Sequence, residues 1–147
     1  MNAQVMLTVD RFRPMKSLTN PEFVEATTAL ASHDAVRLID RDGMPTLRVK
    51  RAVDIEIGLA SKDPAESYKP LAVYFRQKTG PATAKTDPEG RTNFTQSVTP
   101  KGTLLMRHNC VLRGPNGHYE FYVLIQRGSD GAIGLIDPDV ETEDDDN

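Results

Sequence analysis

The chain has 147 residues, of which 38% are hydrophobic and 6% aromatic, with no Trp. A chain of this length is expected to form one domain that buries a core without metals or disulfides. Its single cysteine, Cys110, excludes an internal disulfide and fits a reducing compartment. The net charge of −3 combines a mildly basic body with residues 137–147, which hold seven acids and no base. We therefore predict one domain at 1–136 and a solvated acidic tail at 137–147.

The start of the chain predicts no leader, one strand and one helix. Residues 1–14 lack a long apolar run and a cleavage-site pattern, so no signal peptide is expected. No stretch is long and apolar enough to cross a membrane. Residues 4–12 alternate as a strand does. Thr19 and Glu22 have the spacing of a helical capping box, which predicts a short helix at 21–33.

The strongest β signal covers residues 35–59. Asp42 and Gly43 lie between two alternating runs, and because both tolerate positive φ they predict a hairpin turn. Arg51 and Ala52 interrupt the alternation, which indicates a bulge or a bend. The apolar residues expected on one face are Leu47, Val49, Val53, Ile55, Ile57 and Leu59.

Residues 69–78 predict the next strand, and residues 79–91 a polar loop. Loops of that length are usually functional or mobile. The strand is expected to bury three side chains and to present three others on its opposite face. The buried set is Leu71, Val73 and Phe75, and the outward set is Tyr74, Arg76 and Lys78.

Residues 92–113 predict one or two further strands. Leu104, Met106, His108, Cys110 and Leu112 share a face there, and Arg107 and Asn109 point the other way.

Residues 118–127 allow two readings. Their alternation, Tyr119, Phe121, Val123, Ile125, fits a strand, whereas Phe121, Leu124 and Ile125 also have helical spacing. Aromatic and β-branched content favours the strand.

The expected fold class is α+β and mostly β. It consists of an antiparallel sheet with one or two short helices packed on one face, completed by a dimer partner. A parallel sheet is not expected, because no strand–helix–strand spacing occurs.

No catalytic, metal or cofactor motif is found in the sequence. There is no glycine-rich phosphate loop, and no Cys or His pair has zinc spacing. His108 and Cys110 lie two residues apart, which fits a thiolate nucleophile, but a lone cysteine among apolar neighbours is more typical of a core. We therefore expect no enzyme, no metal, no cofactor and no small-molecule substrate.

The polar sides of the central strands predict a nucleic-acid interface, provided that those strands are neighbours. Cations neutralise phosphates, tyrosine stacks on unpaired bases and asparagine binds base edges. An ordinary solvated sheet face is the alternative, and Asp54 and Glu56 on the same side support it. The candidate interface residues are Arg48, Lys50, Tyr74, Arg76, Lys78, Arg107 and Asn109.

Two runs of the sequence resemble the coat proteins of single-stranded RNA bacteriophages. The first is RAVDIEIGLASKDPAESYKPLAVYFRQ, an alternating strand, a polar turn and a second strand that starts near a Tyr. The second runs from GTLLMRHNCVL through HYEFYVLIQRGSDG to AIGLIDPDV. The resemblance covers residues 46–137 and implies intertwined dimers, with a helix at 118–127 covering the partner's sheet. It further implies an icosahedral shell whose inner sheet face binds genomic RNA.

The function expected from this resemblance is a virion coat protein, assembled in the bacterial cytoplasm, with RNA and copies of itself as partners. Two alternatives stay open on the residues alone. One is a single-stranded nucleic-acid-binding protein with a β-barrel body and a regulatory acidic tail. The other is a non-catalytic β-sandwich adaptor.

Overall fold

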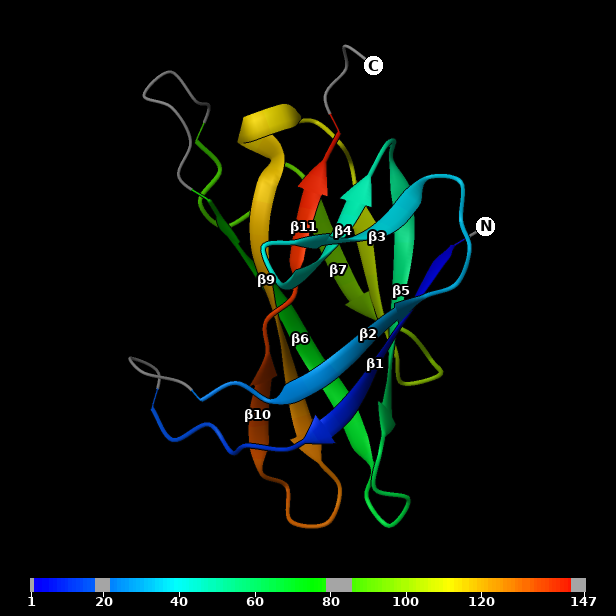
Figure 1. Cartoon of the computed structure of the whole chain (residues 1–147), viewed down its shortest axis with the longest axis vertical. Helices are drawn as coiled ribbons and strands as arrows, with labels where there is room; N and C mark the ends of the chain where they lie inside the picture. The colour runs from blue at the N-terminus through cyan, green and yellow to red at the C-terminus, as the bar shows by residue number, and fades with distance from the viewer. Residues whose placement is uncertain (1, 18–21, 79–85, 144–147) are drawn as a thin grey trace.

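The computed structural model describes residues 2–17, 22–78 and 86–143, which form two β-sheets packed face to face (Figure 1). The first sheet has the strand order β2-β1-β5-β8-β7. Its strands are β1 (Ala3–Arg11), β2 (Glu25–Leu30), β5 (Val53–Ser61), β7 (Phe94–Val98) and β8 (Leu104–His108).

The second sheet is organised around β9, which has different partners on its two edges. β6 pairs with β9 along one edge, and β10 and β11 share the other. β11 then pairs in parallel with β4, which forms an antiparallel hairpin with β3. The strands are β3 (Val36–Arg41), β4 (Met44–Val49), β6 (Tyr68–Gln77), β9 (His118–Arg127), β10 (Ile133–Ile136) and β11 (Asp139–Thr142).

The prediction of a mostly β chain is confirmed, but its details need two corrections. The only helix among the described residues is a short 3-10 turn, Gly114–Gly117. Both sheets are mixed, because β1 pairs in parallel with β5 and β4 with β11. The parallel strands are far apart in sequence, so local spacing gave no sign of them. No helix in the described part of the chain is long and apolar enough to cross a membrane.

The helix predicted at 21–33 is wrong. Residues Glu25–Leu30 form β2, which pairs antiparallel with β1. Two adjacent threonines lie in this segment, and β-branched residues fit a pleated strand better than a helix. Thr19 of the supposed capping box lies outside the described residues.

The core lies between the two sheets, and the predicted apolar faces supply it. Val73 and Phe75 are buried as expected, whereas Leu71 is only half-buried because β6 has a bulge between Pro70 and Ala72. The Phe75 and Phe94 rings stack with centroids 3.8 Å apart. Other fully buried side chains are Leu7, Leu47, Ile55, Ile57, Met106, Phe121 and Ile125.

Gly90 makes this aromatic packing possible. It has φ +69°, and a Cβ at this position would lie 2.7 Å from Phe75 Cβ and 2.9 Å from the Phe94 ring. Only glycine satisfies both the backbone conformation and the space.

The predicted hairpin at Asp42–Gly43 is confirmed, since both residues have positive φ, 55° and 81°. The interruption at Arg51 and Ala52 is the point where the chain crosses from one sheet to the other, because β4 and β5 belong to different sheets. The face shared by residues 47–59 is therefore the inside of a sandwich built by two sheets.

The solvated tail predicted from residue 137 needs correction over Asp139–Thr142. These residues are β11, and all four side chains are buried between β9 and β4. Both acids of this strand are paired with cations: Glu141 lies 2.7 Å from Arg41 and 3.2 Å from Arg48, and Asp139 pairs with Lys78. Residues 144–147 of the predicted tail lie outside the described residues.

Candidate functional site

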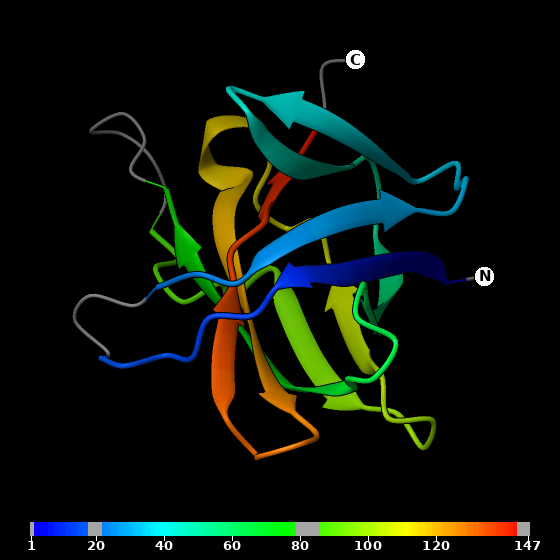
Figure 2. The ribbon, with the colours of Figure 1, turned by 60° about the horizontal axis from the view of Figure 1, so that its bottom comes forward.

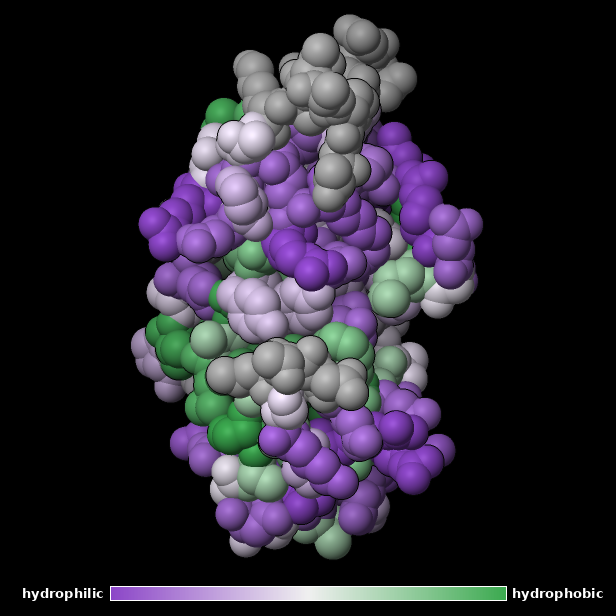
Figure 3. Space-filling view, turned by 90° about the vertical axis from the view of Figure 1, so that its left-hand side faces the viewer, coloured by the Kyte–Doolittle hydropathy of each residue, from purple (hydrophilic) through white to green (hydrophobic). Residues whose placement is uncertain are grey.

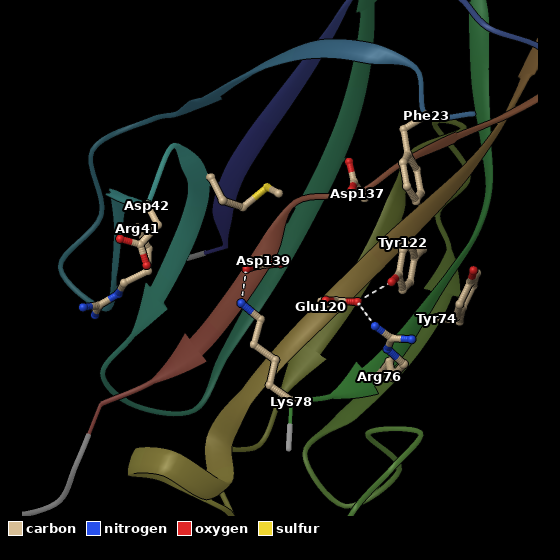
Figure 4. A pocket seen from close by; sticks show the side chains of 11 residues that line it. Phe23, Arg41, Asp42, Tyr74, Arg76, Lys78, Glu120, Tyr122, Asp137 and Asp139 are labelled. Atoms are coloured by element: carbon tan, nitrogen blue, oxygen red, sulfur yellow. Dashed lines mark hydrogen bonds and ion pairs between the residues drawn. The ribbon is translucent and has the colours of Figure 1, made fainter. Parts of the chain in front are cut away.

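A groove of about 650 Å³ lies on the outer side of β6 and β9 (Figure 4). β6 and β9 form its floor, the β3–β4 turn forms one wall, and the segments before β2 and β11 contribute the remainder. The residues lining it are Phe23, Arg41, Asp42, Met44, Tyr74, Arg76, Lys78, Glu120, Tyr122, Asp137 and Asp139.

Three aromatic rings form a row along the groove. The register of β6 and β9 places Tyr74 opposite Tyr122, and their rings stack with centroids 4.7 Å apart. Phe23 stacks on Tyr122 from the other side, with centroids 6.0 Å apart. Such cross-strand aromatic pairs stabilise a sheet. Tyr74 is nevertheless 49% exposed, so the row offers an accessible aromatic surface, which we call the aromatic row.

Ion pairs flank the aromatic row. Arg76 Nη2 lies 2.9 Å from Glu120 Oε2, and the Tyr122 hydroxyl donates a hydrogen bond to the same carboxylate oxygen. Lys78 Nζ donates to Asp139 Oδ2 (Figure 4). Each of these two cations therefore has an acidic partner inside the groove.

Three groups that line the groove have raised pKa values, and for Tyr74 the main cause is burial. Burial, followed by the hydrogen bond to Glu120, raises the pKa of the Tyr122 hydroxyl, which therefore stays a neutral donor. Burial raises the pKa of the Asp137 carboxyl. Within the described residues, Asp137 makes no ion pair and no hydrogen bond to another residue's side chain. Among the described carboxyls that line the groove, Asp137 is the one that lacks such a partner and whose pKa is raised by burial.

The seven predicted interface residues do not share one face. Tyr74, Arg76 and Lys78 do meet in the groove. Arg107 lies on β8 in the other sheet, where it pairs with Asp54 at 3.3 Å. Asn109 follows β8, and its backbone N–H donates to the Asn93 carbonyl.

The remaining two candidates, Arg48 and Lys50, belong to the β3–β4 side of the second sheet. Arg48 lies 3.2 Å from both Glu141 and Glu143. Lys50 is exposed just after β4. The assumption that the central strands are neighbours is therefore wrong, because β4, β6 and β8 do not pair with one another.

The sequence prediction missed eight of the lining residues, which are Phe23, Arg41, Asp42, Met44, Glu120, Tyr122, Asp137 and Asp139. One signal was available. In the strand reading of 118–127, Glu120 and Tyr122 point away from the buried Tyr119 and Phe121, as Tyr74 and Arg76 do on β6. Pairing those two strands would have assembled the floor of the groove.

Cys110 and His108 are in contact but lie in the core. Cys110 Sγ is 3.3 Å from His108 Nδ1, and both side chains are buried. The same nitrogen accepts a hydrogen bond from the Cys110 backbone N–H, and His108 Nε2 bonds Thr142. This arrangement matches the core reading of the pair. No cluster of metal-ligating side chains occurs among residues 2–17, 22–78 and 86–143.

Comparison with known proteins identifies a related fold only. No family model matches the chain, and no curated protein matches it. One solved structure, titled the inclusion body protein PixA from Burkholderia cenocepacia J2315, superposes with a TM-score of 0.61. The match covers 96% of this chain and 94% of that one, at 10% sequence identity. The two proteins therefore share a fold along nearly their entire lengths.

The expectation of a bacteriophage coat protein is wrong, and the virion location that went with it has no support. The structural likeness is to an inclusion body protein. The helix that the coat resemblance required at 118–127 is instead the long strand β9, which confirms the strand reading. The two alternatives, a single-stranded nucleic-acid-binding barrel and a β-sandwich adaptor, gain no support from this likeness either.

Proposed function

We propose that this chain is a non-catalytic protein that associates with copies of itself into dense inclusions. The observation that carries the proposal is the fold shared with PixA, whose title names it an inclusion body protein. The likeness covers 96% of this chain and 94% of that one. Because one fold serves many functions, the surface has to support the proposal as well.

The charge balance of the surface supports close packing of copies. The full chain has 18 bases and 21 acids, so its net charge is only −3. Many of them are paired within the chain, including the Arg41 and Arg48 contacts with Glu141. A protein with little net charge lacks the self-repulsion that keeps copies apart. In Figure 3 hydrophilic side chains cover much of one face, and hydrophobic ones also reach the surface there.

Two strand edges provide places where copies can meet. In the described part of the chain, β2 pairs only with β1, and β3 only with β4 (Figure 2). Ala29 on β2 is exposed, as is Leu38 on β3. An edge strand presents unpaired backbone N–H and C=O groups that a strand of another copy can bind.

Light scattering on the purified protein over a wide concentration range tests this proposal. We expect the apparent mass to rise steeply with concentration. Ala29→Lys and Leu38→Lys place charges on the open edges and are expected to shift assembly to higher concentration. Val111→Lys adds the same charge at an exposed position outside any strand, and it is the matched control. A wild type that stays monomeric at every concentration contradicts the proposal.

A further inference from the structure

We infer that the groove on β6 and β9 binds a neutral saccharide, a pyranose ring with an apolar C–H face and a rim of hydroxyls. The self-association proposed above uses the edges of β2 and β3, whereas this groove lies on the outer side of β6 and β9. The volume of about 650 Å³ lies within the ~300–1,000 Å³ range of small-molecule sites.

The aromatic row supplies the apolar part of the site. The faces of aromatic rings carry negative charge, and the polarised C–H bonds on one face of a pyranose are attracted to them. Tyr74 keeps about half of its surface exposed although it stacks on Tyr122. The position of Tyr74 is fixed by that stacking and by the β6–β9 register, so little side-chain entropy is lost when a ligand packs against it.

The polar groups around the row match hydroxyl groups. Asp137 is half-buried and, within the described residues, has no side-chain partner. A carboxylate removed from water gains strongly from a donated hydrogen bond, and a sugar hydroxyl is such a donor. Arg76 pairs with Glu120 through Nη2, and a guanidinium has five N–H donors in all. The ion pairs Arg76–Glu120 and Lys78–Asp139 hold their side chains in place, so the groove presents hydrogen-bond donors and acceptors in fixed positions (Figure 4).

The charge balance of the groove disfavours an anionic ligand. Three cations line it, Arg41, Arg76 and Lys78, and each is paired with an acid. Four acids line it as well: Asp42, Glu120, Asp137 and Asp139. A phosphate would find no unpaired cation, so its desolvation would not be repaid. A hydroxylated neutral ring needs no net charge and can use both kinds of group.

The geometry of the rings also disfavours a quaternary ammonium ligand. Such cations are held by aromatic cages that surround them, whereas these rings stack against one another, with interplanar angles of 20° and 21°. Stacking covers the faces that these rings turn toward one another, and the half-exposed Tyr74 keeps a face, on the side away from Tyr122, against which a flat ring can pack.

A glycan array probed with the full chain, followed by calorimetry with the neutral oligosaccharides retained, tests the inference. Choline chloride and inorganic phosphate serve as the competing probes. Tyr74→Ala and Asp137→Asn are each expected to weaken saccharide binding at least about tenfold, equal to ~1.4 kcal/mol. Val111→Ala, exposed and outside the groove, is expected to bind as the wild type does. Thermal melts confirm that each variant is folded.

Three results overturn the inference: no neutral saccharide binds, binding survives in both groove variants, or choline or phosphate binds at the groove instead. Calorimetry on the charged edge variants separates the two proposals. If the variants Ala29→Lys and Leu38→Lys remain dispersed and still bind saccharide, both the self-association and the saccharide site are supported. If the wild type never assembles but binds saccharide, only the self-association fails.

Discussion

The Tyr119 hydroxyl donates a 2.7 Å hydrogen bond to Asp87 Oδ2, and both side chains are buried. The second oxygen of Asp87 accepts from the Thr92 backbone N–H at 3.1 Å. Through these two bonds the carboxylate ties the segment before β7 to the middle of the second sheet. Burial and the acidic neighbour raise the pKa of Tyr119, so the phenol remains a donor at all ordinary pH values.

Replacing Tyr119 by Phe removes this donor and leaves a buried carboxylate oxygen without it. An orphaned buried acceptor costs about 1–3 kcal/mol, and we expect urea unfolding of Tyr119→Phe to show a loss in that range. Tyr74→Phe is the control, because no hydrogen bond of the Tyr74 hydroxyl is found among the described residues. Equal stabilities for the two variants would show that the Tyr119–Asp87 bond contributes little.

Replacing Phe75 by Ala is expected to cost about 3–5 kcal/mol, since Phe75 is buried and stacks on Phe94. The neighbouring substitution Tyr74→Ala removes a ring from the outer face of the same strand, so its cost is expected to be much smaller. Urea denaturation measures both. A Phe75→Ala loss below about 1 kcal/mol would mean that β6 faces the other way.

The pH dependence of stability reports on His108. Burial, assisted by the charge of Arg113, lowers its pKa from 6.5 to about 3. As the pH falls, the His108 imidazole therefore takes up a proton near pH 6.5 in the unfolded chain but only near pH 3 in the folded chain. Stability is accordingly expected to fall as pH drops through this window, by up to about 1.4 kcal/mol per pH unit for one proton.

Between pH 4.5 and 6.5 the buried histidines are expected to cause most of the change in stability with pH. Carboxylates with lowered pKa, such as Glu56 and Glu66, lose their contribution only below about their unfolded value of 4.5. Burial also lowers the pKa of His118, so it acts in the same direction. Urea midpoints between pH 4.5 and 6.5 are expected to depend less on pH in His108→Gln than in the wild type. The same measurement on His118→Gln gives the contribution of His118 to the pH dependence. Parallel curves for wild type and His108→Gln would contradict the burial of a neutral imidazole.

Removing β11 is expected to unfold the second sheet. A chain ending at Pro138 lacks the strand that joins β4 to β9 and loses the Glu141 contacts with Arg41 and Arg48. Circular dichroism and urea unfolding measure the result. A chain ending at Glu143 keeps β11 and is the control, expected to remain as stable as the full chain. A folded protein ending at Pro138 would restore the view of residues 139–142 as a dispensable tail.

Local signals predicted the elements of the fold better than their partners. Asp42 and Gly43 identified a hairpin because positive φ is a property of those residues themselves. Val73 and Phe75 revealed the buried side of β6 because alternation is also local. The parallel pairs β1–β5 and β4–β11 left no local trace, because each brings together strands far apart in the chain.

Two predictions from local composition and motif spacing were wrong. Seven acids near the C-terminus indicated a solvated tail, yet Glu141 is buried because arginines from β3 and β4 neutralise it. Thr19 and Glu22 matched a helix start, but the segment that follows pairs with β1 as a strand. Tertiary pairing overrides such short motifs.

The candidate site was predicted in part. Tyr74, Arg76 and Lys78 were selected from one strand, and they do line the groove. Their neighbours Glu120 and Tyr122 depend on the pairing of β6 with β9, and Phe23 comes from a segment read as helix. The acids that neutralise the predicted cations were therefore missing, and a mixed groove was read as a basic face.

Electron tomography of bacterial cells that produce the full chain tests the central claim most directly. We expect dense bodies that label for this protein, fewer of them when Ala29→Lys and Leu38→Lys are combined, and the wild-type number with Val111→Lys. Cells in which the folded wild-type protein stays evenly dispersed at high expression would contradict the proposed self-association.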